Sequence, residues 1–205
     1  MIQAVVFDMG GVMLRLDIHR CVDAFKLQAG FADIEDYLNV FHQKGFIGDL
    51  EAGRITADEF LDECLRHSRP GISRETILAC FDAFLAGLNM DVINFIKEIS
   101  PDYDLYILSN NNSLSSARFA EMMAEVGMPV DRYFKKCFFS FQLRQLKPFP
   151  EIYQSTINGI GLPPEEILFI DDSTTNIEAA ARAGIRTLLY RQGMDIRAAF
   201  SEITA

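Results

Sequence analysis

The chain has 205 residues, of which 49% are hydrophobic and 23% charged, a composition typical of a globular protein with one core or with a core and a smaller inserted domain. Its formal net charge of −10 repels nucleic acids and anionic membranes, so neither is expected as a partner. No apolar run reaches the roughly 18 residues of a membrane span, and no basic-then-apolar leader precedes the first predicted strand, so we expect a cytoplasmic protein.

The first predicted strand covers residues 4–7, a short apolar run that contains two valines. Asp8 follows it directly, and Gly10 and Gly11 then allow the backbone to turn tightly. An Asp in this context could merely cap the next helix. Because ligands of open α/β sheets bind at the carboxyl ends of the strands, we expect instead that Asp8 belongs to a binding site.

The segment between Arg15 and Leu88 is dominated by apolar residues at helical spacing. Thr56 and Glu59 form a predicted capping box at the start of one of its helices. The predicted helices cover residues 19–29, 33–44, 57–67 and 74–86. We interpret residues 16–88 as a helical cap domain inserted into a core domain of residues 1–15 and 89–205.

The second half of the chain alternates between helices and short apolar strands. The predicted strands cover residues 104–108, 136–140, 167–170 and 186–190, and the predicted helices cover 89–99, 115–126, 151–158, 176–183 and 196–203. This alternation implies right-handed crossovers and a parallel sheet. The predicted fold is therefore α/β, a Rossmann-like parallel sheet of about five strands with helices on both faces, plus the inserted helical cap.

Polar side chains follow three of these strands: Asp8 the first, Ser109 and Asn110 the second, and Asp171 and Asp172 the fourth. A further charged residue, Lys147, lies on a loop that contains Pro148 and Pro150. The carboxyl ends of parallel strands meet at one edge, so these side chains can converge. Three carboxylates beside a single lysine favour a divalent cation, and hard oxygen ligands favour Mg²⁺.

These segments resemble the four signature motifs of the haloacid dehalogenase-like (HAD) superfamily, over the whole chain. The matching stretches are Phe7-Asp8-Met9-Gly10-Gly11-Val12, Leu108-Ser109-Asn110, Leu146-Lys147-Pro148-x-Pro150-x-Ile152-Tyr153, and Phe169-Ile170-Asp171-Asp172-Ser173 with Asn176. The inserted helices resemble the C1 cap of that superfamily. Within them, Gly53-Arg54-Ile55-Thr56-x-x-Glu59-Phe60 is similar to the branch of glucose-1-phosphate phosphatases and the N-terminal domain of epoxide hydrolases.

The resemblance implies a magnesium-dependent phosphatase of a small phosphorylated metabolite, such as a sugar phosphate, with an aspartyl-phosphate intermediate. It assigns catalytic roles to Asp8 as nucleophile, to Lys147 as a charge screen and to Asp171 as the anchor of Lys147. It also implies a metal site of Asp8, the Gly10 carbonyl and Asp172, a phosphate site of Ser109, Asn110 and Lys147, and a supporting shell of Asp171 and Asn176.

The sequence departs from the family pattern at Gly10, where most phosphatases of the superfamily carry a second Asp that protonates the leaving group and activates water. General acid–base catalysis is worth roughly 10²–10⁴-fold in rate. Three explanations stay open. A replacement acid could come from Asp17, His19 or His42. The leaving group could need little protonation, as in an anomeric sugar phosphate. The site could also bind phosphate and metal but turn over poorly.

Two alternative functions follow from the same residues. The first is a phosphate-binding or metal-binding regulatory domain with weak or lost turnover. The second is a haloacid dehalogenase, against which Asp171 and Asp172 argue, since two extra carboxylates would repel a departing halide and a carboxylate substrate. The sequence does not distinguish a monomer from a homodimer.

Overall fold

The centre of the molecule is a five-stranded parallel sheet with the strand order β7-β6-β1-β8-β9. The computed structural model describes residues 1–39 and 42–204, with only the backbone of residues 39, 42 and 43. The strands are β1 (Ala4–Phe7), β6 (Asp104–Ser109), β7 (Lys136–Phe139), β8 (Ile167–Asp171) and β9 (Arg186–Leu189). Because β1 is the middle strand, the residues that follow it lie halfway along the carboxyl edge.

Both faces of the sheet are buried, which explains the continuous apolar runs of its strands. The side chains alternate along β1, so that Val5 and Phe7 lie in one cluster and Ala4 and Val6 in the other. The first cluster contains residues of α5 (Met90–Ile99), α6 (Ser113–Glu125) and α11 (Ile196–Thr204), and the second contains residues of α9 (Pro150–Ile160) and α10 (Thr174–Arg182). The predicted α/β fold with helices on both faces is confirmed.

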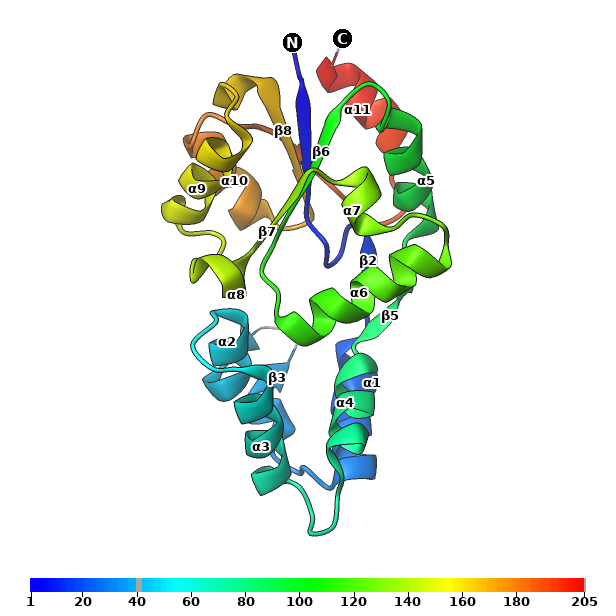
Figure 1. Ribbon diagram of the computed structural model, residues 1–205, viewed down its shortest axis with the longest axis vertical. Coiled ribbons are helices and arrows are strands. Elements are labelled where there is room, and N and C mark those ends of the chain that lie inside the picture. Colours follow the sequence, from blue (N-terminus) through cyan, green and yellow to red (C-terminus); the bar gives the residue numbers. More distant parts are fainter. Residues whose placement is uncertain (40–41, 205) are drawn as a thin grey trace.

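The cap segment, residues 16–88, lies beyond the carboxyl edge of the sheet, at the opposite end of the molecule from both chain termini (Figure 1). Its elements are α1 (Ile18–Ala24), the π-helical turn η1 (Phe25–Ala29), the 3₁₀ turn η2 (Ile34–Asp36), β3 (Leu38–Asn39), β4 (His42–Gln43), α2 (Gly45–Glu51), α3 (Ala57–His67) and α4 (Arg74–Asp82). It has its own buried cluster, which includes Phe25, Phe31 and Phe60.

Two short strands connect the cap segment to the sheet. β2 (Leu14–Leu16) pairs antiparallel with β5 (Leu85–Leu88), and the register shifts between Arg15 and Leu16. The remaining short elements are α7 (Val130–Tyr133), α8 (Ser140–Leu143) and η3 (Pro164–Glu166). Among the described residues, every helix falls short of the length and apolar character that crossing a bilayer requires.

The cap segment differs from the prediction in three places. The predicted helix over residues 33–44 is wrong, because this stretch forms η2 and the antiparallel pair of β3 and β4. Packing explains the difference: the rings of Phe31 and Tyr37 lie with their centroids 4.8 and 5.2 Å from that of His67 on α3, and this long-range contact overrides local helical periodicity. In addition, α2 was not predicted, and α4 ends at Asp82, before β5 begins.

The capping box predicted at the start of α3 is present. The Glu59 backbone N–H donates to Thr56 Oγ1 at 3.2 Å, and Glu59 Oε2 accepts from the Thr56 backbone N–H at 2.7 Å. We expect Thr56→Ala to lower the free energy of unfolding by about 1 kcal/mol. Urea unfolding measures this loss, and Thr56→Ser should retain the wild-type value. An unchanged stability in the alanine variant would contradict the role of the cap.

Candidate active site

Three carboxylates converge at the carboxyl edge of the sheet. Asp8 directly follows β1, Asp171 ends β8 and Asp172 follows it. One carboxylate oxygen from each lies within 4.8 Å of the others. Asp8 and Asp171 are buried, while Asp172 is exposed. Strands far apart in the sequence thus place three acidic groups around one point.

The buried side chain of Lys147 joins two of these carboxylates. Its Nζ lies 2.8 Å from Asp8 Oδ1 and 2.7 Å from Asp171 Oδ2, and it also donates to the Leu108 carbonyl oxygen at 3.2 Å. Burial lowers the pKa of Lys147, but the charges of Asp8 and Asp171 outweigh it and raise this pKa above its usual value. Lys147 is therefore a fixed positive charge inside the acidic cluster.

The Asp171 carboxylate is buried and accepts several hydrogen bonds from the protein. It is fully buried, its Oδ1 accepts from the Ser173 backbone N–H at 2.7 Å, and its two oxygens accept from Asn176 Nδ2 at 3.1 and 3.0 Å. Asn176 is in turn positioned by the Tyr153 hydroxyl, which donates to the Asn176 carbonyl oxygen at 3.1 Å. This arrangement orients the Asp171 oxygen that accepts from Lys147.

The charge balance of the site favours a divalent cation. The pKa of Asp8 is raised to about 7, because burial and the negative charges of Asp171 and Asp172 together outweigh the opposing effect of Lys147. Burial and Asp171 also raise the pKa of Asp172 above its usual value. The single positive charge of Lys147 thus does not balance the negative charges of three carboxylates. Their clustered hard oxygen donors fit Mg²⁺, which would relieve this repulsion.

Gly11 makes room for the Asp172 carboxylate. Its φ of +74° lies in the left-handed region, and a Cβ atom at this position would lie 2.0 Å from Asp172 Oδ2. On the other side, Arg191 Nη1 donates to the Asp172 carbonyl oxygen at 2.7 Å. Arg191 was missed from the sequence, although it comes soon after β9 and the strand-end rule that located Asp172 would also have located it.

The loop after β6 is tied to the lysine loop. Asn110 Nδ2 donates to the Lys147 carbonyl oxygen at 2.9 Å, and the Lys147 backbone N–H donates to Asn110 Oδ1 at 2.8 Å. The Asn110 side chain is therefore engaged with the protein, and any contact with a ligand falls to its backbone amide. Ser109 is buried, and its Oγ donates to the Asn110 carbonyl oxygen at 3.3 Å.

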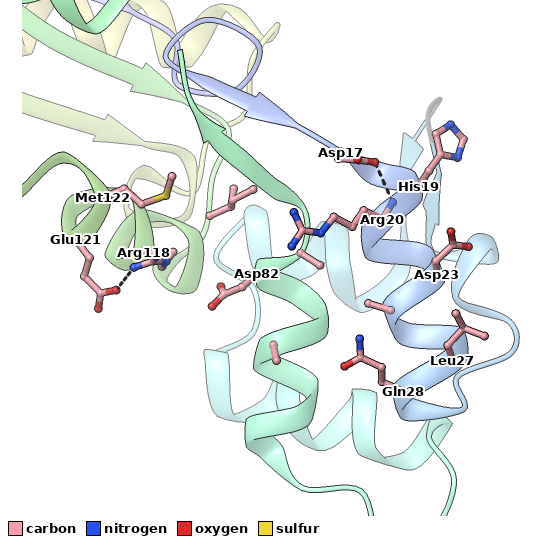
Figure 2. A pocket seen from close by; sticks show the side chains of 14 residues that line it. Asp17, His19, Arg20, Asp23, Leu27, Gln28, Asp82, Arg118, Glu121 and Met122 are labelled. Carbon is pink, nitrogen blue, oxygen red and sulfur yellow. Dashed lines mark hydrogen bonds and ion pairs between the residues drawn. The ribbon is translucent and has the colours of Figure 1, made fainter. Parts of the chain in front are cut away.

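A cavity of about 80 Å³ lies between this edge and the cap segment, and Gly10, Ser109 and Asn110 are among its lining residues. Asp17 and His19 do not line it. They lie on a separate, larger groove between α1, α4 and α6, where Asp17 Oδ1 accepts from the Arg20 backbone N–H at 2.9 Å and caps α1 (Figure 2). The structure thus does not bring Asp17 or His19 together with Ser109, and the His42 side chain lies outside the described residues.

Fold and site together define a class: α/β proteins with a cluster of carboxylates that could hold a metal ion, at the carboxyl edge of a parallel sheet and next to an inserted, mostly helical segment (Figure 1). The sequence profile of the family described as haloacid dehalogenase-like hydrolase matches residues 2–184. The chain belongs to this family, and the predicted membership is confirmed.

Individual relatives match this chain over nearly its whole length. D-ribitol-5-phosphate phosphatase of Bacteroides thetaiotaomicron is 33% identical over 199 residues, which cover 96% of each chain. The crystal structure of a wild-type HAD family enzyme from the same species, in complex with magnesium and inorganic phosphate, superimposes with a TM-score of 0.89 at 30% identity, covering 97% of this chain and 99% of that one. A predicted HAD-like hydrolase from Porphyromonas gingivalis gives a TM-score of 0.88 at 32% identity, covering 100% and 98%.

The pKa of Asp8 predicts a pH-dependent stability when divalent cations are chelated. The folded-state pKa lies above the ordinary 3.8, so the folded protein binds this proton more tightly than the unfolded chain does. The stabilisation is complete below pH 3.8 and is lost as the pH rises through about 7. We expect the free energy of unfolding to fall by up to about 1.4 kcal/mol per pH unit across this window.

Urea titrations at several pH values in the presence of a chelator measure this slope. Asp8→Asn cannot titrate and should lose it, while Asp102→Asn, an exposed residue near the opposite edge of the sheet, should keep it. An equal slope in Asp8→Asn and the wild type would assign the effect to another group.

Proposed function

We propose that this protein is a magnesium-dependent phosphomonoester hydrolase that acts on a small sugar phosphate or sugar-alcohol phosphate through an aspartyl-phosphate on Asp8. The observation that carries the proposal is the contact of the buried Asp8 carboxylate with Lys147, within the cluster of Asp8, Asp171 and Asp172. A carboxylate that must attack an anionic phosphate needs such compensating charge around it.

The relatives support the proposal. One of them is named for its action on D-ribitol 5-phosphate, and a solved HAD family enzyme with the same fold binds magnesium and inorganic phosphate. The predictions of a HAD-like phosphatase and of a Mg²⁺ cofactor agree with both. Carried over to this chain, they favour a substrate that combines a phosphate group with a small polyol.

In this proposal Asp8, Asp172 and the Gly10 backbone carbonyl would hold Mg²⁺. When bound, Mg²⁺ neutralises the charge that builds up on the transferring phosphoryl group. Asp8 attacks the phosphorus atom, and the bond from phosphorus to the ester oxygen breaks. A water molecule then attacks the phosphorus of the aspartyl-phosphate, which releases inorganic phosphate and restores the Asp8 carboxylate.

The surrounding residues position these groups. Lys147 remains next to Asp8 and screens the phosphate charge, since it is paired with Asp171, whose carboxylate is in turn held by Asn176. Ser109 Oγ and the Asn110 backbone amide would bind phosphate oxygens from the loop after β6. The cap segment lines the cavity from the other side and would shield it from bulk solvent.

The test is phosphate release from a panel of sugar and sugar-alcohol phosphates, including D-ribitol 5-phosphate. We expect turnover with Mg²⁺, loss with a chelator and recovery when Mg²⁺ is restored. Asp8→Asn removes the nucleophile and should abolish turnover, whereas the matched surface variant Asp102→Asn should keep it.

Two outcomes would contradict this function. Chelator-resistant halide release from 2-haloacids would assign the protein to the dehalogenases. Tight Mg²⁺ binding without hydrolysis of any ester would indicate a binding or regulatory domain.

Gly11 provides an independent test of the metal site. In Gly11→Ala the new methyl group displaces the Asp172 carboxylate. We expect the Mg²⁺ concentration at half-maximal activity to rise roughly 10–100-fold. The matched control is Gly71→Ala, because Gly71 also has a left-handed φ of +87° but has no neighbouring atom within 4 Å of the added Cβ. If both variants show the same Mg²⁺ dependence, Gly11 does not act through Asp172.

A further inference from the structure

We propose that Glu51, at the carboxyl end of α2 in the cap segment, is the general acid and base that the core lacks at Gly10. The inference rests on the proposed phosphatase function. It assigns a catalytic role to a residue that no sequence motif singles out, since α2 itself was not predicted.

The first observation is the lining of the cavity above the catalytic edge. Its described polar lining residues other than Glu51 are neutral: Ser109, Asn110, Asn111, Asn112 and Ser115. The rest of the described lining is apolar or glycine, including Leu38, Ile47, Phe81 and Phe84. Within the described part of this cavity, Glu51 is therefore the side chain with a proton to give to a leaving group and take back from water.

The second observation places Glu51 beside the proposed phosphate-binding loop. The fully buried Ser140 hydroxyl donates to the Glu51 carbonyl oxygen at 2.6 Å and accepts from the Asn111 backbone N–H at 2.9 Å. A single hydroxyl thus links the end of α2 to the residue two positions after Ser109. This link holds the backbone of Glu51 beside the loop that follows β6.

A close backbone contact fixes the same end of α2. Gly53 has φ +67°, and a Cβ atom there would lie 2.1 Å from the Phe141 carbonyl oxygen on α8. Only glycine allows this approach of the cap backbone to the core. Two independent contacts, one polar and one steric, therefore hold the end of α2 against the core.

The third observation concerns the position that the usual acid would occupy. A Cβ atom on Gly10 would lie 3.0 Å from Leu16 Cδ1, so an apolar side chain borders that space. An aliphatic alcohol, such as the product from D-ribitol 5-phosphate, leaves poorly as an alkoxide and needs a proton. Asp17 and His19 line the other groove, whereas Glu51 lines the cavity that Gly10 also lines.

Over the two proposed steps Glu51 gives up one proton and takes one back. As Asp8 attacks phosphorus, the phosphorus–ester bond breaks, its electron pair stays on the ester oxygen, and that oxygen takes the proton of the Glu51 carboxyl group to give the alcohol. In the second step Glu51 removes a proton from the attacking water. The phosphorus–Asp8 bond then breaks, phosphate leaves, and Glu51 is protonated again.

The test compares the activity of Glu51→Gln on two substrates that differ in their leaving group. The isosteric amide retains the backbone contact with Ser140 but has no acidic proton. We expect kcat for an alkyl phosphate such as D-ribitol 5-phosphate to fall roughly 10²–10⁴-fold. Formation of the phosphoenzyme from p-nitrophenyl phosphate, measured as the burst of nitrophenolate, should change little, because that leaving group departs without a proton.

The matched control is Asp49→Asn, which removes a carboxylate of the same helix that is paired with Arg54 and should behave as wild type. Gly10→Asp in the Glu51→Gln background should restore part of the alkyl phosphatase activity, once Leu16 has shifted. Equal losses with both substrates, or no loss with either, would overturn the role of Glu51. A loss confined to alkyl esters in His42→Gln but absent in Glu51→Gln would assign the role to His42.

The two proposals fail in different ways. If wild type hydrolyses neither ester with Mg²⁺, the phosphatase function itself is wrong. If wild type hydrolyses both and Asp8→Asn neither, while Glu51→Gln is unaffected, only the assignment of the acid is wrong.

Discussion

The structure depends on one electrostatic constraint, the Lys147 ammonium group held between the buried carboxylates of Asp8 and Asp171. Burying any of these charges without a partner is costly, and removing one partner from a buried pair typically destabilises a protein by about 3–5 kcal/mol. The lysine makes it possible to bury two acids side by side. It leaves a net negative charge with Asp172, which is the charge that a divalent cation would balance.

A network of hydrogen bonds maintains this arrangement across the whole sheet edge. The amide of Asn110 connects the loop after β6 to the lysine loop, and Asn176 on α10 holds Asp171 at the end of β8. Tyr153 on α9 then orients Asn176. Because these donors and acceptors are fixed before a ligand arrives, little reorganisation would accompany charge development on a phosphate.

The sheet edge and the cap segment have different roles in the proposed reaction. The sheet edge holds the nucleophile and the charged groups, which need a rigid support. The cap segment forms the opposite wall of the cavity and, through Ser140 and Gly53, docks the end of α2 against the core. This docking explains how an acid missing from the loop after β1 could be supplied by Glu51, from a different part of the fold.

The sequence alone determined the parallel sheet, the convergence of Asp8, Asp171 and Asp172, and the position of Ser109 at the end of the strand next to β1, because alternating strands and helices force right-handed crossovers and place all carboxyl ends at one edge. It also predicted the approach of Lys147. Only the tertiary structure decided the packing of Phe31 and Tyr37 on His67, the docking of Ser140 on Glu51, and the separation of Asp17 from the cavity. The physical reason is the sequence separation of the contacts. Periodicity within one element shows which of its faces is buried, but the side of the cap segment that meets the core depends on contacts between residues far apart in the chain.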